Sequence, residues 1–241
     1  MKNIITYENL RSFTYSNDHL IQGEIKGIVI FFTGLGSQAM YDEDPFHGKY
    51  LAERGIVWLM PYNTPWNWMN RRAVNFTDEL IDVLVKRYGL PENLPIVSTG
   101  DSMGGLCSLT YMAYAKRTPV ACVANCPVCD LVYHFTERPD LPRTIYTAYC
   151  DVEGTLEEAL ATGSPLHLLE AGKLPQAAYT IFHCEADDAV NIDRHSRRFV
   201  AAAEGRLPVT LYAIPDRGHC DLGEKNHEKF LAISVDAILR K

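Results

Sequence analysis

The sequence predicts an α/β fold: a mainly parallel, doubly wound sheet with helices on both faces. Short and almost continuously apolar runs recur along the chain, as expected for strands that are covered on both faces. Stretches with helical periodicity separate these runs, and strands that alternate with helices favour a parallel sheet. With 241 residues, 47% of them hydrophobic, the chain can bury a substantial core as a single domain, 1–241. The predicted strands are 27–32, 56–60, 96–98, 120–124, 179–182 and 209–214.

The first segment of the chain has a different pattern. Residues 12–15 and 20–25 alternate polar and apolar side chains, which predicts a hairpin at an edge of the sheet. The clearest helix is predicted over 76–88, where apolar and aromatic side chains recur every four residues before Gly89 ends the run. The same reasoning predicts helices over 104–115, 193–203 and 224–239.

One connection is too long for this alternating pattern. The segment 125–178 is much longer than the dozen or more residues that a helical crossover needs. It contains several aromatic residues, prolines and a short helical stretch at 155–161. We therefore expect a small cap insertion, at about 128–172, over the carboxyl edge of the sheet.

The composition of the chain argues against two classes of binding partner, nucleic acids and membranes. The formal net charge is −7 and there is no long basic run, which argues against binding the phosphate backbone of a nucleic acid. No apolar leader or membrane-spanning run is visible, so we expect no membrane association and a cytoplasmic location. The seven cysteines are an odd number and several lie in apolar segments, as expected for reduced thiols.

A nucleophile motif lies in the middle of the chain. Residues 96–105 read IVSTGDSMGG, which satisfies G-x-S-x-G with Gly100, Ser102 and Gly104. An apolar strand precedes the motif and a helical stretch follows it, which is the context that a catalytic serine on a sharp strand-to-helix turn requires. The glycines are needed because side chains there would collide with neighbouring backbone. The alternative is an ordinary glycine-rich turn with a solvated serine.

This stretch resembles the nucleophile elbow of the α/β-hydrolase superfamily. It is most similar to the branch of prolyl-oligopeptidase-like peptidases, dienelactone hydrolases and acyl esterases, and the resemblance extends from about Gly27 to Leu239. The resemblance implies an α/β-hydrolase fold, with the catalytic residues in the chain order serine, acid, histidine.

The resemblance places the acid after a late strand. Residues 179–190 read YTIFHCEADDAV, similar to the family pattern of an apolar strand followed by His-Gly-x-x-Asp-x-x-Val. His183 and Asp187 fall on the pattern, and Cys184 replaces its usual glycine. Asp187 is therefore the expected acid. Asp188 and Glu185 are the nearest alternatives for the acid. The remaining alternative is a solvated acidic loop without a catalytic role.

The base is expected after the last strand. Gly218 and His219 match the Gly-His pair of the family and lie directly before the last predicted helix. Six other histidines have weaker contexts: His19, His47, His167 and His227 suit surface roles, His195 lies on a helix beside arginines, and His134 lies in the expected cap. The expected roles follow: Ser102 attacks an acyl carbon, His219 accepts and later donates its proton, and Asp187 stabilises the imidazolium.

An oxyanion hole needs preorganised N–H donors. One should be the backbone of Met103, directly after the nucleophile. The second should come from the loop 33–37 (TGLGS), which resembles the His-Gly-x-Gly stretch of the family; that match assigns Leu35, with Gly36 as the alternative. An ordinary turn would use the same glycines, and neither phosphate-binding spacing is met.

The loop 61–68 (PYNTPWNW) follows a predicted strand and carries two tryptophans. Trp66 and Trp68 either line a substrate pocket or pack under the cap, and the sequence favours neither interpretation.

The remaining motifs favour no metal and no cofactor. Cys126 and Cys129 have redox spacing but no thioredoxin-like surroundings, which favours packing. Cys184 and Cys220 each follow a histidine, but a metal on His219 would remove the base. The alternative for these cysteines is an oxidation-sensitive site.

The expected activity is hydrolysis of a carboxylic ester with a small or medium acyl group. A prolyl-oligopeptidase-like peptidase or a thioesterase would use the same residues. The peptidase relatives carry a large extra domain that filters substrates, and the roughly 26 residues before the first buried strand are too few for one. The expected partner is a small-molecule ester or a short peptide. A non-catalytic binding protein of the same fold is the remaining alternative, since fold alone does not fix function.

Overall fold

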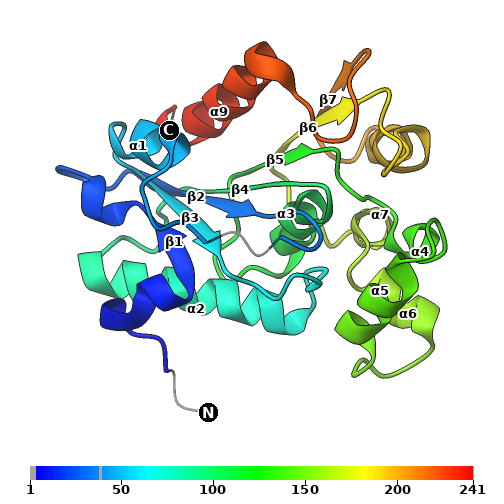
Figure 1. Cartoon of the computed structure of the whole chain (residues 1–241), viewed down its shortest axis with the longest axis horizontal. Coiled ribbons are helices and arrows are strands. Elements are labelled where there is room, and N and C mark those ends of the chain that lie inside the picture. Colours follow the sequence, from blue (N-terminus) through cyan, green and yellow to red (C-terminus); the bar gives the residue numbers. More distant parts are fainter. Residues whose placement is uncertain (1–3, 38–39, 241) are drawn as a thin grey trace.

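A computed structural model describes residues 4–37 and 40–240 as one sheet with helices on both faces (Figure 1). The strands run in the order β1-β3-β2-β4-β5-β6-β7. All neighbours from β3 to β7 are parallel, and β1 pairs with β3 in the antiparallel direction. Their bounds are β1 Thr14–Ser16, β2 Gly27–Phe32, β3 Ile56–Pro61, β4 Ile96–Asp101, β5 Ala121–Asn125, β6 Ala178–Cys184 and β7 Val209–Ile214.

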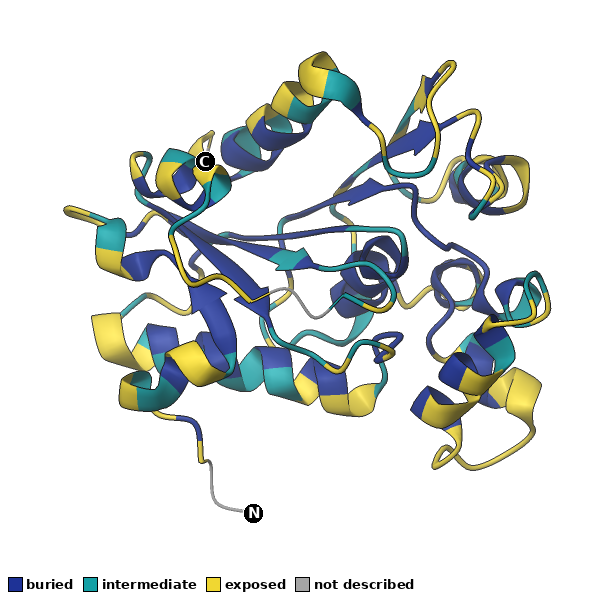
Figure 2. Cartoon of the chain, viewed as in Figure 1, coloured by how far each residue is buried: buried dark blue, intermediate teal, exposed yellow. Residues whose placement is uncertain are grey.

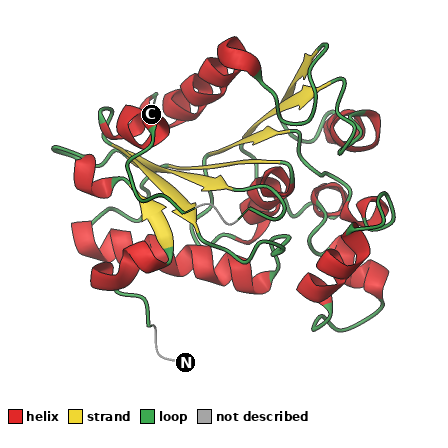
Figure 3. Cartoon of the chain, in the orientation of Figure 1, coloured by secondary structure: helices red, strands yellow, loops and turns green. Residues whose placement is uncertain are grey.

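Two layers of helices cover the sheet. Helices α1 (Phe46–Ala52) and α9 (Gly223–Leu239) lie on one face, and α2 (Arg71–Tyr88) and α3 (Met103–Tyr114) lie on the other (Figures 1 and 3). The last helix before β7, α8 (Arg198–Ala203), continues directly from a π-helical turn at Asp193–Arg197. None of the described helices combines the length and the apolar character that a membrane span requires.

The strands are buried on both faces, which is why they read as continuous apolar runs in the sequence (Figure 2). Strand β7 is only partly buried, as expected for the last strand at an edge. The predicted α/β architecture with a mainly parallel sheet is confirmed.

The predicted N-terminal hairpin is wrong. Only β1 forms, and residues 20–25 form no strand. Tertiary hydrogen bonds decide this segment: the Asn17 amide donates to the carbonyls of Gly48 and Ile56 and accepts from the Trp58 N–H. These bonds anchor the chain to β3 and α1 immediately after β1, and the 3₁₀ turn Asp18–Leu20 with irregular backbone after it takes the place of a second strand. Another 3₁₀ turn, Tyr7–Ser12, precedes β1. Alternation along a short segment carries no information about such partners.

The long connection between β5 and β6 contains four helices among its described residues. They are α4 (Leu131–His134), α5 (Leu141–Tyr149), α6 (Leu156–Ala161) and α7 (Pro165–Glu170). Helix α5 packs against the loop after β3, where the Tyr149 hydroxyl donates to the Trp68 carbonyl and the Asn70 amide donates to the Ala148 carbonyl. Its predicted function as a cap stays a prediction.

Candidate active site

Ser102 occupies the sharp turn between β4 and α3. Its backbone has φ 55° and ψ −120°, a conformation that side chains rarely adopt and that stores strain. Two glycines make the turn possible. A Cβ on Gly100 would lie 2.2 Å from the Gly104 carbonyl oxygen, and a Cβ on Gly104 would lie 1.9 Å from that of Phe32. The turn therefore holds the serine side chain beyond the carboxyl end of β4.

The structure brings the three predicted catalytic side chains together. The Nε2 atom of His219 lies 2.8 Å from the Ser102 hydroxyl oxygen, and its Nδ1 atom lies 2.7 Å from a carboxylate oxygen of Asp187. Each residue comes from a loop or turn at the carboxyl edge of the sheet, after β4, β6 and β7. One imidazole thus connects a nucleophilic hydroxyl to a carboxylate, the arrangement needed to activate a serine.

The carboxylate of Asp187 is buried and well fixed. One oxygen accepts the backbone N–H groups of Ala189 and Val190, at 2.9 and 2.8 Å, while the other faces His219. The two alternatives from the sequence lie elsewhere, since Asp188 is exposed and Glu185 pairs with Arg197.

His183 holds the acid loop in place, a role that its position in the sequence pattern did not reveal. It is fully buried, and its Nε2 atom lies 2.9 Å from the Val190 carbonyl oxygen and 3.4 Å from a carboxylate oxygen of Asp187. Its Nδ1 atom lies 2.6 Å from the Ser196 hydroxyl. His183 therefore joins the two ends of the loop that presents Asp187.

The charges within this group are complementary. Burial alone would raise the pKa of Asp187, but hydrogen bonds from His183 and His219 hold it well below its usual range. Burial would likewise lower the pKa of His219, but the hydrogen bond and charge of Asp187 raise it above the ordinary value. Asp187 therefore favours the imidazolium, the form that His219 takes after accepting a proton from Ser102.

The N–H groups of Leu35 and Met103 stay the candidates for an oxyanion hole. Within the described chain neither N–H has a protein partner. The alternative donor, Gly36, already donates to the Pro65 carbonyl at 2.9 Å. The loop also comes close to the nucleophile, because a Cβ on Gly34 would lie 3.6 Å from that of Ser102.

Comparisons with known proteins were made by sequence and by structure. No protein-family model matches the chain, and no curated protein matches it. Several solved structures, in contrast, match the chain. S-Formylglutathione hydrolase from Agrobacterium tumefaciens is similar with a TM-score of 0.68 and 16% identity, over 88% of this chain and 85% of that one. Thermogutta terrifontis esterase 2 has a TM-score of 0.62 and 19% identity, over 91% and 86%. The chain has the α/β-hydrolase fold.

A peptidase shares this α/β-hydrolase fold over part of its length. The acylaminoacyl peptidase from Pyrococcus horikoshii has a TM-score of 0.69 and 12% identity over 91% of this chain. The matched part is 38% of that peptidase. Esterases and peptidases of the α/β-hydrolase superfamily are therefore both among the structural neighbours, as the sequence resemblance implied.

The two tryptophans have different environments in this hydrolase fold. Trp68 is only 1% exposed, and its indole N–H donates to the Thr144 hydroxyl on α5. It therefore packs under the inserted helices, one of the two roles that the sequence allowed. Trp66 is 47% exposed and lines an open pocket of about 600 Å³ with Tyr62 and Phe76, so it is the one of the two that a ligand can reach.

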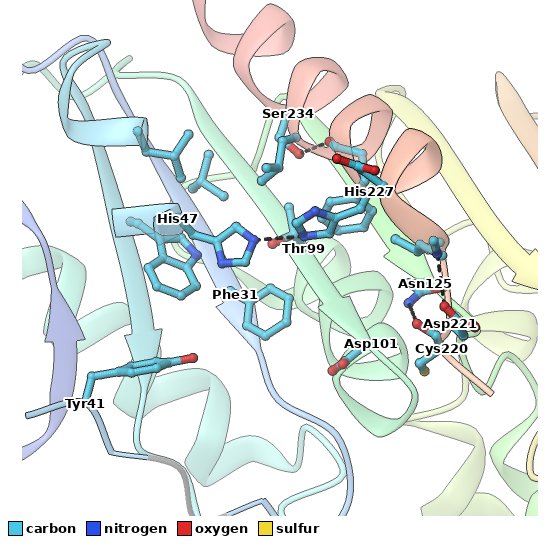
Figure 4. Close-up of a pocket in the computed structure, with 18 residues that line it drawn as sticks. Phe31, Tyr41, His47, Thr99, Asp101, Asn125, Cys220, Asp221, His227 and Ser234 are labelled. Atoms are coloured by element: carbon cyan, nitrogen blue, oxygen red, sulfur yellow. Dashed lines mark hydrogen bonds between the residues drawn. The ribbon is translucent and has the colours of Figure 1, made fainter. Parts of the chain in front are cut away.

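A cavity of about 450 Å³ lies between the sheet and helices α1 and α9, beside the segments that carry Ser102 and His219 (Figure 4). Phe31 and Trp58 form part of its apolar wall, while Asp101 and Cys220, the neighbours of Ser102 and His219, reach its other end. Nothing in the sequence indicates this cavity, because its walls come from four strands, two helices and two loops.

The cavity is also lined by polar groups. His47 and His227, expected at the surface, are half-buried, and their Nε2 atoms lie 2.8 Å apart across the cavity wall. Asp101 and Asn125 each have a buried side-chain oxygen without a hydrogen-bond partner among the described residues. Burial raises the pKa of Asp101 to about 6. The charged side chains on the described wall are acidic, so the cavity does not favour a negatively charged ligand.

Proposed function

We propose that the protein is a serine hydrolase that cleaves carboxylic esters with small or medium acyl groups. The observation that carries the proposal is the continuous chain of hydrogen bonds from the Ser102 hydroxyl through His219 to Asp187. A serine hydroxyl is a weak nucleophile at neutral pH and gains its reactivity from such a base. A surface serine or a purely structural histidine has no need of this arrangement.

The reaction follows from the roles of these groups. The oxygen of Ser102 forms a bond to the acyl carbon while its proton passes to Nε2 of His219. The N–H groups of Leu35 and Met103 are the proposed donors to the resulting oxyanion, where each donor contributes roughly 3–4 kcal/mol. His219 then protonates the leaving alkoxide as its bond to carbon breaks. Water, activated by the same imidazole, releases the acid and restores Ser102.

Thioester and peptide hydrolysis are the second candidates, because both proceed through the same acyl-enzyme. A specific likeness supports each of them: one structural neighbour is an S-formylglutathione hydrolase and another is an acylaminoacyl peptidase. The proposed substrate is in every case a small molecule or a short peptide, handled without a cofactor.

The proposal is tested in two steps. A fluorophosphonate probe should label the wild-type protein and leave Ser102→Ala unlabelled, with Ser12→Ala, an exposed serine on the N-terminal 3₁₀ turn, as the control. Absence of labelling in folded wild-type protein would support a non-catalytic binding protein instead.

Initial rates on nitrophenyl esters of rising chain length, on a thioester and on aminoacyl arylamides then separate the three activities. Faster turnover of the arylamides than of every ester would replace the esterase proposal by a peptidase.

The two tryptophans are tested with the same ester panel. If Trp66 contacts the substrate, Trp66→Ala shifts the chain length that gives the highest kcat/KM. Trp68→Ala serves as the packing control, since it should lower stability without changing that preference.

A further inference from the structure

Three cysteines, Cys126, Cys184 and Cys220, lie close together beside His219. The sulfur of Cys126 accepts the backbone N–H groups of Cys184 and Cys220, each at 3.4 Å. The sulfur of Cys220 lies 3.6 Å from Nε2 of His219, the same atom that contacts Ser102. The sulfur atoms of Cys126 and Cys220 and a ring nitrogen of His219 all lie within 4.8 Å of one another. Two thiols are thus close to each other and to the base.

The backbone at both thiols is strained. Cys126 has φ 44° and Cys220 has φ 61°, a left-handed conformation that is uncommon for residues other than glycine. Cys126 directly follows β5, and Cys220 directly follows His219. Such strain persists only where the surrounding structure holds it, and it is common at functional sites. The proximity of the two thiols is therefore fixed by the fold and not by a freely moving loop.

The two thiols differ in their access to small molecules. Cys220 is partly exposed and lines the cavity of Figure 4, whereas Cys126 is fully buried. The contact with Cys220 and burial both raise the pKa of Cys126 far above the ordinary value, so Cys126 reacts with peroxide more slowly than an exposed thiol does. Because thiolates react with peroxides and thiols do not, an oxidant in the cavity reacts first with Cys220, whose proton the neighbouring imidazole can accept.

We propose that Cys220 is a peroxide-oxidation site, with Cys126 as its resolving thiol, and that the resulting disulfide switches the hydrolase off. In the first step the Cys220 sulfur attacks a peroxide oxygen; the O–O bond breaks, Cys220 becomes a sulfenic acid and one water leaves. In the second step the Cys126 sulfur forms the S–S bond, and its proton leaves with the sulfenic hydroxyl as a second water. The two thiols are oxidised by two electrons, and hydrogen peroxide is reduced to water.

The bond would disturb the base directly, and this consequence rests on the proposed function. A disulfide requires the two sulfur atoms to move to about 2.05 Å, which draws Cys220 away from His219 and toward β5. His219 is the preceding residue and has to keep its 2.8 Å contact with Ser102. A displacement of about 1 Å in such a contact can cost about 100-fold in rate. Reduction of the bond should restore the contact.

The test uses the full chain, reduced and then treated with a few equivalents of hydrogen peroxide in the presence of EDTA. Nitrophenyl acetate hydrolysis, expressed relative to the reduced form of each variant, should fall at least tenfold in the wild type and recover with dithiothreitol. Mass spectrometry should find a peptide carrying residue 126 linked to a peptide carrying residue 220. The matched control is Cys150→Ser, which removes an exposed thiol on the inserted segment and should behave as the wild type does.

Two further variants separate the steps. Cys220→Ser should keep its activity through peroxide treatment. Cys126→Ser should lose activity, and dithiothreitol should not restore it, because the sulfenic acid formed on Cys220 has no resolving thiol and oxidises further. Loss of activity in Cys220→Ser equal to that of the wild type, or absence of the linked peptides in inactivated protein, would overturn the proposal. If the reduced wild type does not hydrolyse esters or react with fluorophosphonate, the proposed function fails, while the peptide linkage still decides whether the thiols form the pair.

Discussion

Two of the histidine–carboxylate groups in the described chain are buried, and only one of these two faces a nucleophile. In the first, His219 contacts Asp187 through Nδ1 and Ser102 through Nε2. In the second, His195 lies in the π-helical turn before α8 and contacts Glu137 through Nε2 at 2.9 Å. Glu137 also contacts Nδ1 of His134 at 2.6 Å.

The difference lies in what occupies the second ring nitrogen. Nδ1 of His195 accepts the backbone N–H groups of Cys129 and Asp130, at 3.2 and 3.3 Å. The Nε2 atom therefore carries the proton and donates it to Glu137, which leaves no free lone pair for proton transfer. Around His219, Asp187 orients one nitrogen and leaves the other for Ser102. A buried carboxylate beside a histidine is thus insufficient for a catalytic base; the other nitrogen has to face a reactive group.

The largest expected effect separates the two histidines directly. His219→Gln should lower kcat by about 10⁶-fold, because the only base of the proposed triad is lost. His195→Gln should leave kcat within about threefold per folded molecule and instead lower the free energy of unfolding. Steady-state kinetics on nitrophenyl acetate and urea denaturation measure the two effects. Equal losses of kcat in both variants would contradict the comparison.

The acid gives the second largest effect. Asp187→Asn should lower kcat by about 10³- to 10⁴-fold with little change in KM, because the amide neither stabilises the imidazolium nor fixes the tautomer of His219. The matched controls are Asp188→Asn and Glu185→Gln, the neighbouring acids, which should stay near the wild-type rate. If kcat fell strongly in one of these controls and not in Asp187→Asn, that control residue would be the acid.

The pH dependence gives a smaller effect with a defined sign. The proposed mechanism needs neutral His219, so kcat/KM should fall about tenfold for each pH unit below the pKa of this imidazole in the free enzyme. Because Asp187 raises that pKa above the ordinary histidine value of 6.5, the acidic limb should lie above pH 6.5. In Asp187→Asn the limb should move to lower pH. A limb that stays at the same pH would show that another group titrates.

Glu137 gives the smallest effect on activity. Glu137→Gln should lower the free energy of unfolding by about 2 kcal/mol, since it weakens two buried hydrogen bonds, and should change kcat/KM by less than about threefold. Hydrogen bonds from His134 and His195 outweigh burial and lower the pKa of Glu137 from 4.5 to about 2. The stability that this carboxylate contributes is therefore present above pH 4.5 and is lost as the pH falls toward 2.

The difference between Glu137→Gln and the wild type should accordingly shrink over that range of pH. Denaturation curves at several pH values measure it, with Glu157→Gln, an exposed position on α6, as the control. A constant difference from neutral pH down to pH 2 would show that the carboxylate charge contributes nothing.

The sequence by itself determined the parallel sheet and the elbow at Ser102, and the resemblance to the α/β-hydrolase superfamily assigned Asp187 and His219 to their loops. Strands buried on both faces must be apolar throughout, and a strained elbow needs Gly100 and Gly104; both requirements are local and therefore visible in the sequence. The environment of His195 was not visible in the sequence, because its partners Cys129, Asp130 and Glu137 lie 58 to 66 residues away along the chain.

The tertiary structure alone decided the remaining features. The side chain of Asn17 prevents the N-terminal hairpin through contacts with β3 and α1. The cavity beside Ser102 and His219 and the approach of Cys126 to Cys220 join segments that are nearly a hundred residues apart. Periodicity and motif spacing report how a residue relates to its neighbours in sequence, whereas distances between loops at one edge of a sheet are set by strand order and packing.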